Sequence, residues 1–330
     1  MHQKTSDSHG ICFTYLFTCQ PHGAALSILI RAAWITIVRL LATLWRASSR
    51  RATGWDKTVT QPRWQPLHGA HAIERARLTV SFREPLPRKL SRKLADKVDE
   101  IREEIGFGAR NVRELHQISL GPNGAPMPQA ATQTLQGWDF RRLNQRNDII
   151  EMLVHEGESI SFETADYGRW EFFKGRFLRV MRDLLVAASD VIDISQVSIE
   201  YIDRFSFDGA PNNASLSSLL VETVLGSLPE PATSGGQLWH LHRGWFEPWG
   251  RDQILINQNF DAQDGQIVNR GAVRSVRVIT KADLRPSEIV ELDSIDETLE
   301  ELHKRSNKVF AEALHPEVRE VIGLELDQYA

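Results

Sequence analysis

Alternating apolar and polar positions predict most of the strands in this chain. In residues 73–82, Leu78, Val80 and Phe82 alternate with polar residues, which is the period of a half-buried strand. The clearest alternation covers residues 196–207, whose apolar face carries Val197, Ile199, Tyr201, Phe205 and Phe207. The same signals place further strands at residues 114–120, 133–140, 146–154, 159–162, 237–246, 253–260, 273–280 and 288–292.

Apolar residues that recur every three or four positions predict the helices. This spacing covers residues 88–105 and 166–188, a short stretch near 216–225, and a long final helix over 294–314. Ser294 and Glu297 have the spacing of a capping box, in which each side chain would satisfy a free backbone N–H at the start of that helix. The apolar stripe of the final helix consists of Ile295, Leu299, Leu302, Val309, Phe310 and Leu314.

Strands joined by short turns, with helices set between them, predict the α+β class with mainly antiparallel sheet. Hairpin turns are expected at residues 155–158 and at Asp264-Gly265. A chain of 330 residues has room for one large domain or two ordinary ones. We expect two related halves, at residues 66–208 and 209–326, preceded by an extension, residues 1–60, that does not belong to the core.

Composition bounds the class of protein. Hydrophobic residues make up 42% of the chain and charged residues 25%, as in ordinary globular proteins. The two cysteines, Cys12 and Cys19, precede the body, which excludes a disulfide framework and a thiolate zinc site there and suits a reducing, cytoplasmic setting. Phosphate-binding glycine loops, Gly-x-Ser-x-Gly elbows, His-Glu-x-x-His helices and EF-hand loops are missing from the sequence. We therefore expect no cofactor.

The N-terminal segment has a charge of its own. Residues 1–55 hold six basic residues against one acid, a net +5 within a total of −4, so the remainder carries −9 and general duplex binding is not favoured. The apolar stretch 24–46 is interrupted by Arg31 and Arg39, and with Arg46 these lie on one side of a helix. Three interpretations stay open: an extension produced by a start codon assigned too far upstream, which we favour, a helix lying on a membrane surface, or a membrane span.

One short motif has the residue types of a metal site. His240 and His242 would point to the same face of a strand, and Glu247 follows them, as in the first metal motif of cupins. The second cupin motif is absent from the chain. The favoured interpretation is a strand whose histidines face solvent and flank core residues.

Two further candidates lie on strands. Asp203 falls on the apolar face of residues 196–207, where a buried carboxylate would need a partner or a raised pKa. Arg204 faces the other way, beside Glu200, as an expected surface pair. A basic and aromatic patch of Trp138, Phe140, Arg141, Arg142 and Arg146 could grip single-stranded nucleic acid, although a solvated hairpin face is favoured.

Several segments resemble one family. They are Pro66-Leu67 before the first strand with Pro85-Leu86 after it, the run Tyr201-Ile-Asp-Arg-Phe205, and the helix with Leu299, Leu302, His303 and Phe310 that ends in His315-Pro-Glu-Val-Arg319. They occur in the order found in a sporadically distributed bacterial family of uncharacterised proteins of about 250 residues. The resemblance covers roughly residues 66–326. Family members typically carry Asn in place of Asp203, and an aspartate-rich strand end in place of residues 279–283.

The resemblance implies a fold but no activity, since the family has none assigned. The sequence therefore predicts a non-enzymatic binding or interaction protein whose partner is unidentified, another protein being one candidate. A scattered bacterial distribution would suit an accessory or defence-type component. Tyr201, Asp203 and Arg204 are the candidate binding residues. The alternatives are a metal-dependent enzyme using His240, His242 and Glu247, and single-stranded nucleic-acid binding.

Overall fold

The computed structural model describes residues 63–117, 132–233, 237–267 and 271–329. Residues 62–330 form one compact unit by their backbone contacts. The expectations for residues 1–60, including the helix at 24–46, lie outside the described residues. Among the described residues, no helix is both long enough and apolar enough to cross a membrane.

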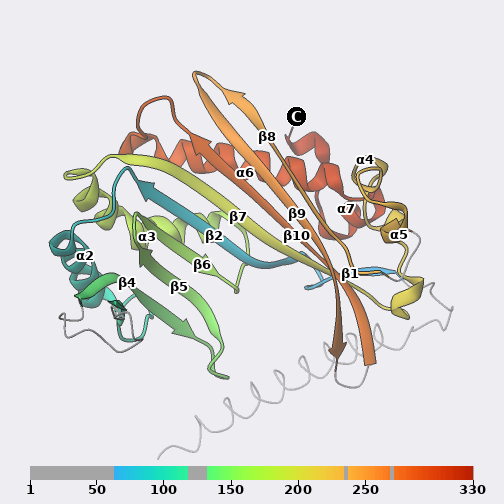
Figure 1. Ribbon diagram of the computed structural model, residues 1–330, viewed down its shortest axis with the longest axis horizontal. Coiled ribbons are helices and arrows are strands. Elements are labelled where there is room, and N and C mark those ends of the chain that lie inside the picture. The colour runs from blue at the N-terminus through green and yellow to red at the C-terminus, as the bar shows by residue number, and fades with distance from the viewer. Residues whose placement is uncertain (1–62, 118–131, 234–236, 268–270, 330) are drawn as a thin grey trace, which may run out of the picture. The chain divides into compact units, whose positions relative to one another are not determined.

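One antiparallel sheet organises the described chain, which confirms the α+β class (Figure 1). Its strands follow the order β3-β4-β5-β6-β2-β7-β10-β9-β8, and β1 pairs with the end of β7. The strands are β1 (Trp64–Pro66), β2 (Ile73–Phe82), β3 (Asn111–Gln117), β4 (Thr132–Leu143), β5 (Ile149–Glu156), β6 (Ser159–Thr164), β7 (Ile194–Phe207), β8 (His240–Trp249), β9 (Asp252–Ile267) and β10 (Gly271–Arg285). Because β7 pairs with β2 on one side and β10 on the other, one sheet runs through both expected halves.

Among the described residues, helices cover one face of this sheet and leave the other uncovered (Figure 1). They are α2 (Arg88–Ile101), α3 (Trp170–Ser189), α4 (Glu222–Leu225), α5 (Glu230–Thr233), α6 (Ile295–Ala313) and α7 (Pro316–Ile322). The expected apolar stripe of α6 is confirmed, since all six of its residues are buried. The apolar face of β7 is confirmed in the same way and lies against the helices.

Three local expectations were wrong. Ser294 forms no capping bond at α6, because its hydroxyl donates to the carbonyl oxygen of Glu291, 2.8 Å away. Asp264-Gly265 is no turn, because both residues lie inside β9 and pair with β10, so β9 is longer than its apolar alternation. Residues 288–292 form no strand, since Val290 makes a backbone bond to Ile194 and a short 3-10 turn follows.

Two apolar clusters share the covered face of the sheet, and β7 passes through both. Tyr201 belongs to the first cluster and Phe205 to the second. Asp203 therefore lies where the two clusters separate. Thr280 on β10 and Gln258 on β9 lie at the same division between the clusters. Thr280 pairs with Tyr201 across the sheet, and Gln258 pairs with Thr280. A belt of polar side chains thus crosses the sheet beneath α6.

Candidate functional site

A cavity of about 570 Å³ opens where this polar belt reaches the edge of α6. Its walls come from β7, α6, the chain before β2, the start of α3 and the segment after α7. The lining residues are Ala70, His71, Ala72, Ile73, Tyr167, Gly168, Arg169, Trp170, Tyr201, Asp203, His303, Asn307, Phe310, Ile322, Gly323, Leu324 and Gln328. The cavity therefore contains two of the three binding residues expected from the sequence.

Asp203 is the polar group at the floor of the cavity. Its side chain is buried, and its Oδ1 atom has no hydrogen-bond partner among the described residues. Its neighbours across the ladders are the apolar residues Ile73 and Val278. Burial disfavours the charged carboxylate and raises the pKa of Asp203 well above its usual value. Burial in this apolar setting therefore favours the neutral form of the carboxyl group over the charged form.

The rest of the polar belt is paired, which makes Asp203 stand out. The Gln258 amide nitrogen donates to the Thr280 hydroxyl and to the Val309 carbonyl oxygen, each at 3.3 Å. Its amide oxygen accepts from the Arg243 guanidinium at 2.9 Å. Buried polar groups are normally paired in this way, so the orphan oxygen of Asp203 calls for an explanation.

Tyr201 lies two residues before Asp203, on the same face of β7, and its side chain contacts α6. Its hydroxyl lies 2.8 Å from Nδ1 of His303. The amide nitrogen of Asn307 lies 3.1 Å from Nε2 of the same ring. Burial lowers the pKa of His303 to about 4, so the ring is neutral at neutral pH. This chain of contacts fixes the direction of the Tyr201 hydroxyl at the cavity wall.

Aromatic rings form much of the remaining wall. The Tyr167 ring meets Tyr201 edge to face, with centroids 5.8 Å apart, and lies 6.0 Å from the His71 ring. Burial, and to a lesser degree the charge of His68, lowers the pKa of His71. Nδ1 of His71 is buried and has no partner among the described residues. The cavity thus combines neutral aromatic surfaces with a few polar atoms.

Arg204, the third expected binding residue, does not reach this cavity. It lies on the uncovered face and forms a bidentate ion pair with Glu74, with both N···O distances 2.9 Å. The expected pairing with Glu200 was wrong, because Glu200 lies 3.5 Å from Arg77 on the neighbouring strand β2. The adjacent strands supplied partners that the sequence of β7 alone could not identify.

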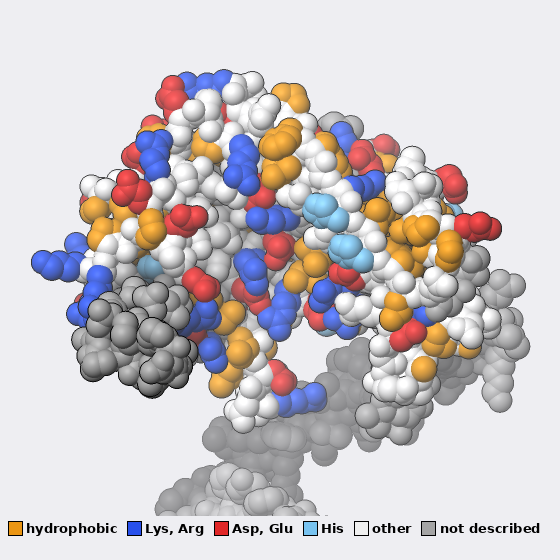
Figure 2. Space-filling model, viewed as in Figure 1, with side chains coloured by type: hydrophobic (Ala, Val, Ile, Leu, Met, Phe, Trp, Pro, Cys, Tyr) orange, Lys and Arg blue, Asp and Glu red, His pale blue; other side chains and the backbone are white. Residues whose placement is uncertain are grey.

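The metal motif is divided between two faces of β8. His240 and His242 share the uncovered face, where Figure 2 shows histidines among many charged side chains. Nδ1 of His240 lies 2.6 Å from Asp261, and His242 bonds Asn259. Glu247 lies on the covered face and accepts from Arg305 at 2.9 Å. No group of three metal-binding side chains gathers anywhere in the described part of the chain.

The basic and aromatic patch is likewise divided. Trp138 is buried, and its indole nitrogen donates to the Ser91 carbonyl oxygen at 3.0 Å. Arg141 pairs with the buried Asp139 at 2.6 Å, and Arg142 pairs with Glu151 at 2.8 Å. The indole ring is therefore not on a surface where a base could stack.

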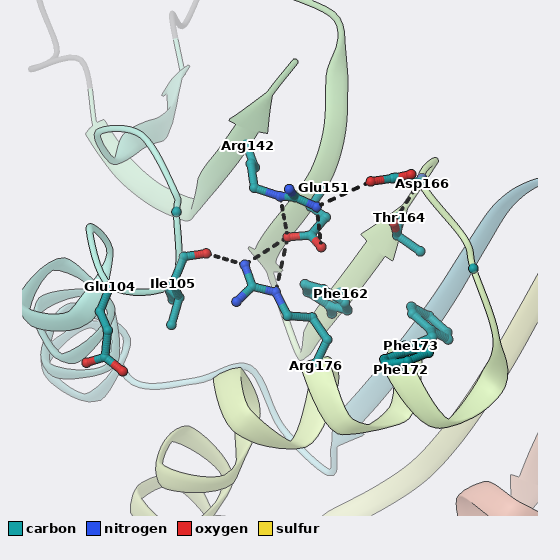
Figure 3. A pocket seen from close by; sticks show the side chains of 12 residues that line it. Glu104, Ile105, Arg142, Glu151, Phe162, Thr164, Asp166, Phe172, Phe173 and Arg176 are labelled. Atoms are coloured by element: carbon teal, nitrogen blue, oxygen red, sulfur yellow. Dashed lines mark hydrogen bonds and ion pairs between the residues drawn. The ribbon is translucent and has the colours of Figure 1, made fainter. Parts of the chain in front are cut away.

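A second cavity, of about 430 Å³, lies beyond the start of α3 (Figure 3). Figure 3 shows the guanidinium groups of Arg142 and Arg176 converging on the Glu151 carboxylate, at 2.8 Å and 2.9 Å. Arg176 also donates to the Ile105 carbonyl oxygen. Because this buried carboxylate is fully paired within the chain, the Asp203 cavity is the stronger candidate site.

Sequence reasoning missed several residues of the Asp203 cavity. His303 and Asn307 lie one helical turn apart on α6 and interrupt the apolar stripe between Leu302 and Phe310. Polar residues within an apolar stripe were the signal available for them. Tyr167 and His71 lie in connecting segments, where no periodicity indicates which way a side chain points.

No family model and no curated protein matches the chain. The resemblance to a sporadically distributed bacterial family therefore stays a prediction.

Proposed function

We propose that this protein is a binding protein rather than an enzyme, and that it holds a small organic molecule in the cavity beneath α6. The observation that carries the proposal is the unpaired Oδ1 of the buried Asp203. A buried polar atom without a partner costs about 1–3 kcal/mol. A ligand that donates a hydrogen bond to Asp203 would remove that cost.

The size and lining of the cavity support this proposal. Small-molecule sites are typically concave, roughly 300–1,000 Å³ in volume, and mostly apolar with a few convergent polar groups. A cavity of about 570 Å³ with Asp203, Tyr201 and Asn307 among aromatic walls fits that description. A cytoplasmic setting remains part of the proposal, on the ground that the chain has no cysteine after Cys19.

A library of small organic molecules, screened by thermal unfolding of the full chain, tests the function. Ligands that bind the native state raise the unfolding temperature, by an amount that grows with the ratio of ligand concentration to Kd. Ala70 is exposed and lines the cavity, so Ala70→Trp should block ligand entry with little effect on folding. Ala210 is also exposed but lies outside the cavity lining, so Ala210→Trp is the matched control.

We expect stabilising ligands whose effect is lost in Ala70→Trp and kept in Ala210→Trp. A screen in which no compound stabilises the protein would contradict the proposal. Ligands that stabilise both variants equally would also contradict it, because they would bind elsewhere.

A further inference from the structure

We propose that the group bound beside Asp203 is a positively charged amine of the ligand, an inference that rests on the binding function proposed above. Among the described residues, no side chain that lines the cavity places a cation on the carboxyl group of Asp203. An ammonium group would supply the missing hydrogen-bond donor and, through its positive charge, would stabilise the carboxylate form of Asp203.

The charged and titratable groups of each wall support this assignment. The chain before β2 contributes His71, α6 contributes His303, and the segment before α3 contributes Tyr167 and Arg169. On β7 the titratable side chain besides Asp203 is Tyr201. The neighbours from β10 and from the segment after α7 are Val278 and Gln328, which are uncharged. Burial lowers the pKa of both histidines, so neither is a cation at neutral pH.

Of the described residues that line the cavity, Arg169 is the one permanent cation, and it is exposed. Only burial shifts the pKa of Asp203, with no contribution from a neighbouring charge. No cation of the described residues therefore stabilises the charged form of Asp203, and a cationic ligand group would do so.

The aromatic walls suit the same group. A cation within about 6 Å of an aromatic ring face is attracted to it, most strongly when water is excluded. Tyr167, Trp170 and Tyr201 all line the cavity. Walls of this kind accept a cation and the hydrocarbon attached to it, whereas they offer little to an anion.

Binding of an amine would release a proton. The ammonium ion enters as R–NH₃⁺, the Asp203 carboxyl group gives its proton to solvent, and the product is the pair R–NH₃⁺···⁻OOC–Asp203 with one H⁺ in solution. The affinity for the amine then rises with pH, by up to about tenfold per unit below the pKa of Asp203. An alcohol of the same skeleton has no charge with which to stabilise the carboxylate and releases no proton, so its affinity does not rise with pH.

Calorimetry on the full chain tests this with primary amines from methylamine to phenethylamine, each beside the alcohol of the same skeleton. We expect phenethylamine to bind more tightly at pH 8 than at pH 6, because the raised pKa of Asp203 makes the carboxylate form more available at the higher pH. Its affinity should fall by about tenfold or more in Asp203→Asn, while that of 2-phenylethanol changes less than about twofold. Asp283→Asn, at a buried aspartate of β10 outside the cavity lining, should leave both affinities unchanged.

The outcomes separate this inference from the function on which it rests. If alcohols bind in the cavity and amines do not, or if amine affinity is independent of pH and of Asp203, the ligand class is wrong and the binding function stands. If neither series binds and the library screen is also negative, both proposals fail.

Discussion

The imidazole ring of His303 stacks on the indole ring of Trp170, with centroids 4.1 Å apart and planes inclined by 9°. The contact joins α6 to the start of α3 at the edge of the cavity. It also removes water from the imidazole, which is why the pKa of His303 falls from 6.5 to about 4.

This stacking predicts a loss of stability in acid. The unfolded chain takes up the proton of His303 near pH 6.5 and the folded chain near pH 4, so this contribution is complete above pH 6.5 and lost as the pH falls through that window. Between pH 7 and pH 4.5, the free energy of unfolding of His303→Gln should therefore fall by about 2 kcal/mol less than that of the native protein. Urea unfolding at both pH values measures the difference. Equal losses in the two proteins would contradict the prediction.

Asp203→Asn should stabilise the protein at neutral pH. The pKa of Asp203 is raised in the folded state, so the unfolded chain ionises first and stability is lost as the pH rises above the usual value for aspartate. An amide of similar size avoids this loss, and we expect a gain of about 1 kcal/mol or more at pH 7. A gain in stability joined to a loss of ligand affinity is typical of a functional residue.

Asp283→Asn is the matched control for that substitution. Asp283 is equally buried, but it accepts a hydrogen bond from Gln196 and forms an ion pair with Lys281, each at 2.8 Å. Removing its charge should destabilise the protein by about 1–3 kcal/mol. If both amides stabilise the protein, burial alone explains the effect and Asp203 has no special status.

The register of β7 gives a third prediction. Phe205 is fully buried against Phe310, so Phe205→Ala should cost about 3–5 kcal/mol. Arg204→Ala, one residue earlier on the partly exposed face, should cost under about 1 kcal/mol because it breaks only a partly exposed ion pair with Glu74. Urea unfolding compares the two, and a silent Phe205→Ala would show that the register is wrong.

The strands and the main helices could be predicted from the sequence because their periodicity reflects a single buried face. Asp203 stood out for the same reason, as a charge on the apolar face of β7. Partners across the sheet could not be predicted, since Arg204 has acidic neighbours on its own strand and on β2. The choice of Glu74 over Glu200 depends on pairing with β2, which a single strand does not encode.

Turn signals failed where the tertiary structure overrode them. Asp264-Gly265 has the composition of a hairpin turn, yet pairing with Arg274 and Val273 continues through both residues. His303 and Asn307 were missed because a polar residue in a helical stripe is usually solvated, whereas stacking on Trp170 and contact with Tyr201 partly bury His303.

Gly137 provides the last prediction, because it allows β4 and β5 to approach closely. A Cβ atom at this position would lie 1.9 Å from the backbone carbonyl oxygen of His155, and backbone atoms cannot move aside as a flexible side chain can. Gly137→Ala should therefore destabilise the protein by about 3 kcal/mol, the upper end of the range for overpacking. Gly265→Ala in β9 is the control, because its Cβ would meet no atom within 4 Å, and its unfolding free energy should change by under about 0.5 kcal/mol. Thermal and urea unfolding of the two variants give the comparison, and equal stability would show that β4 and β5 are not paired in this register.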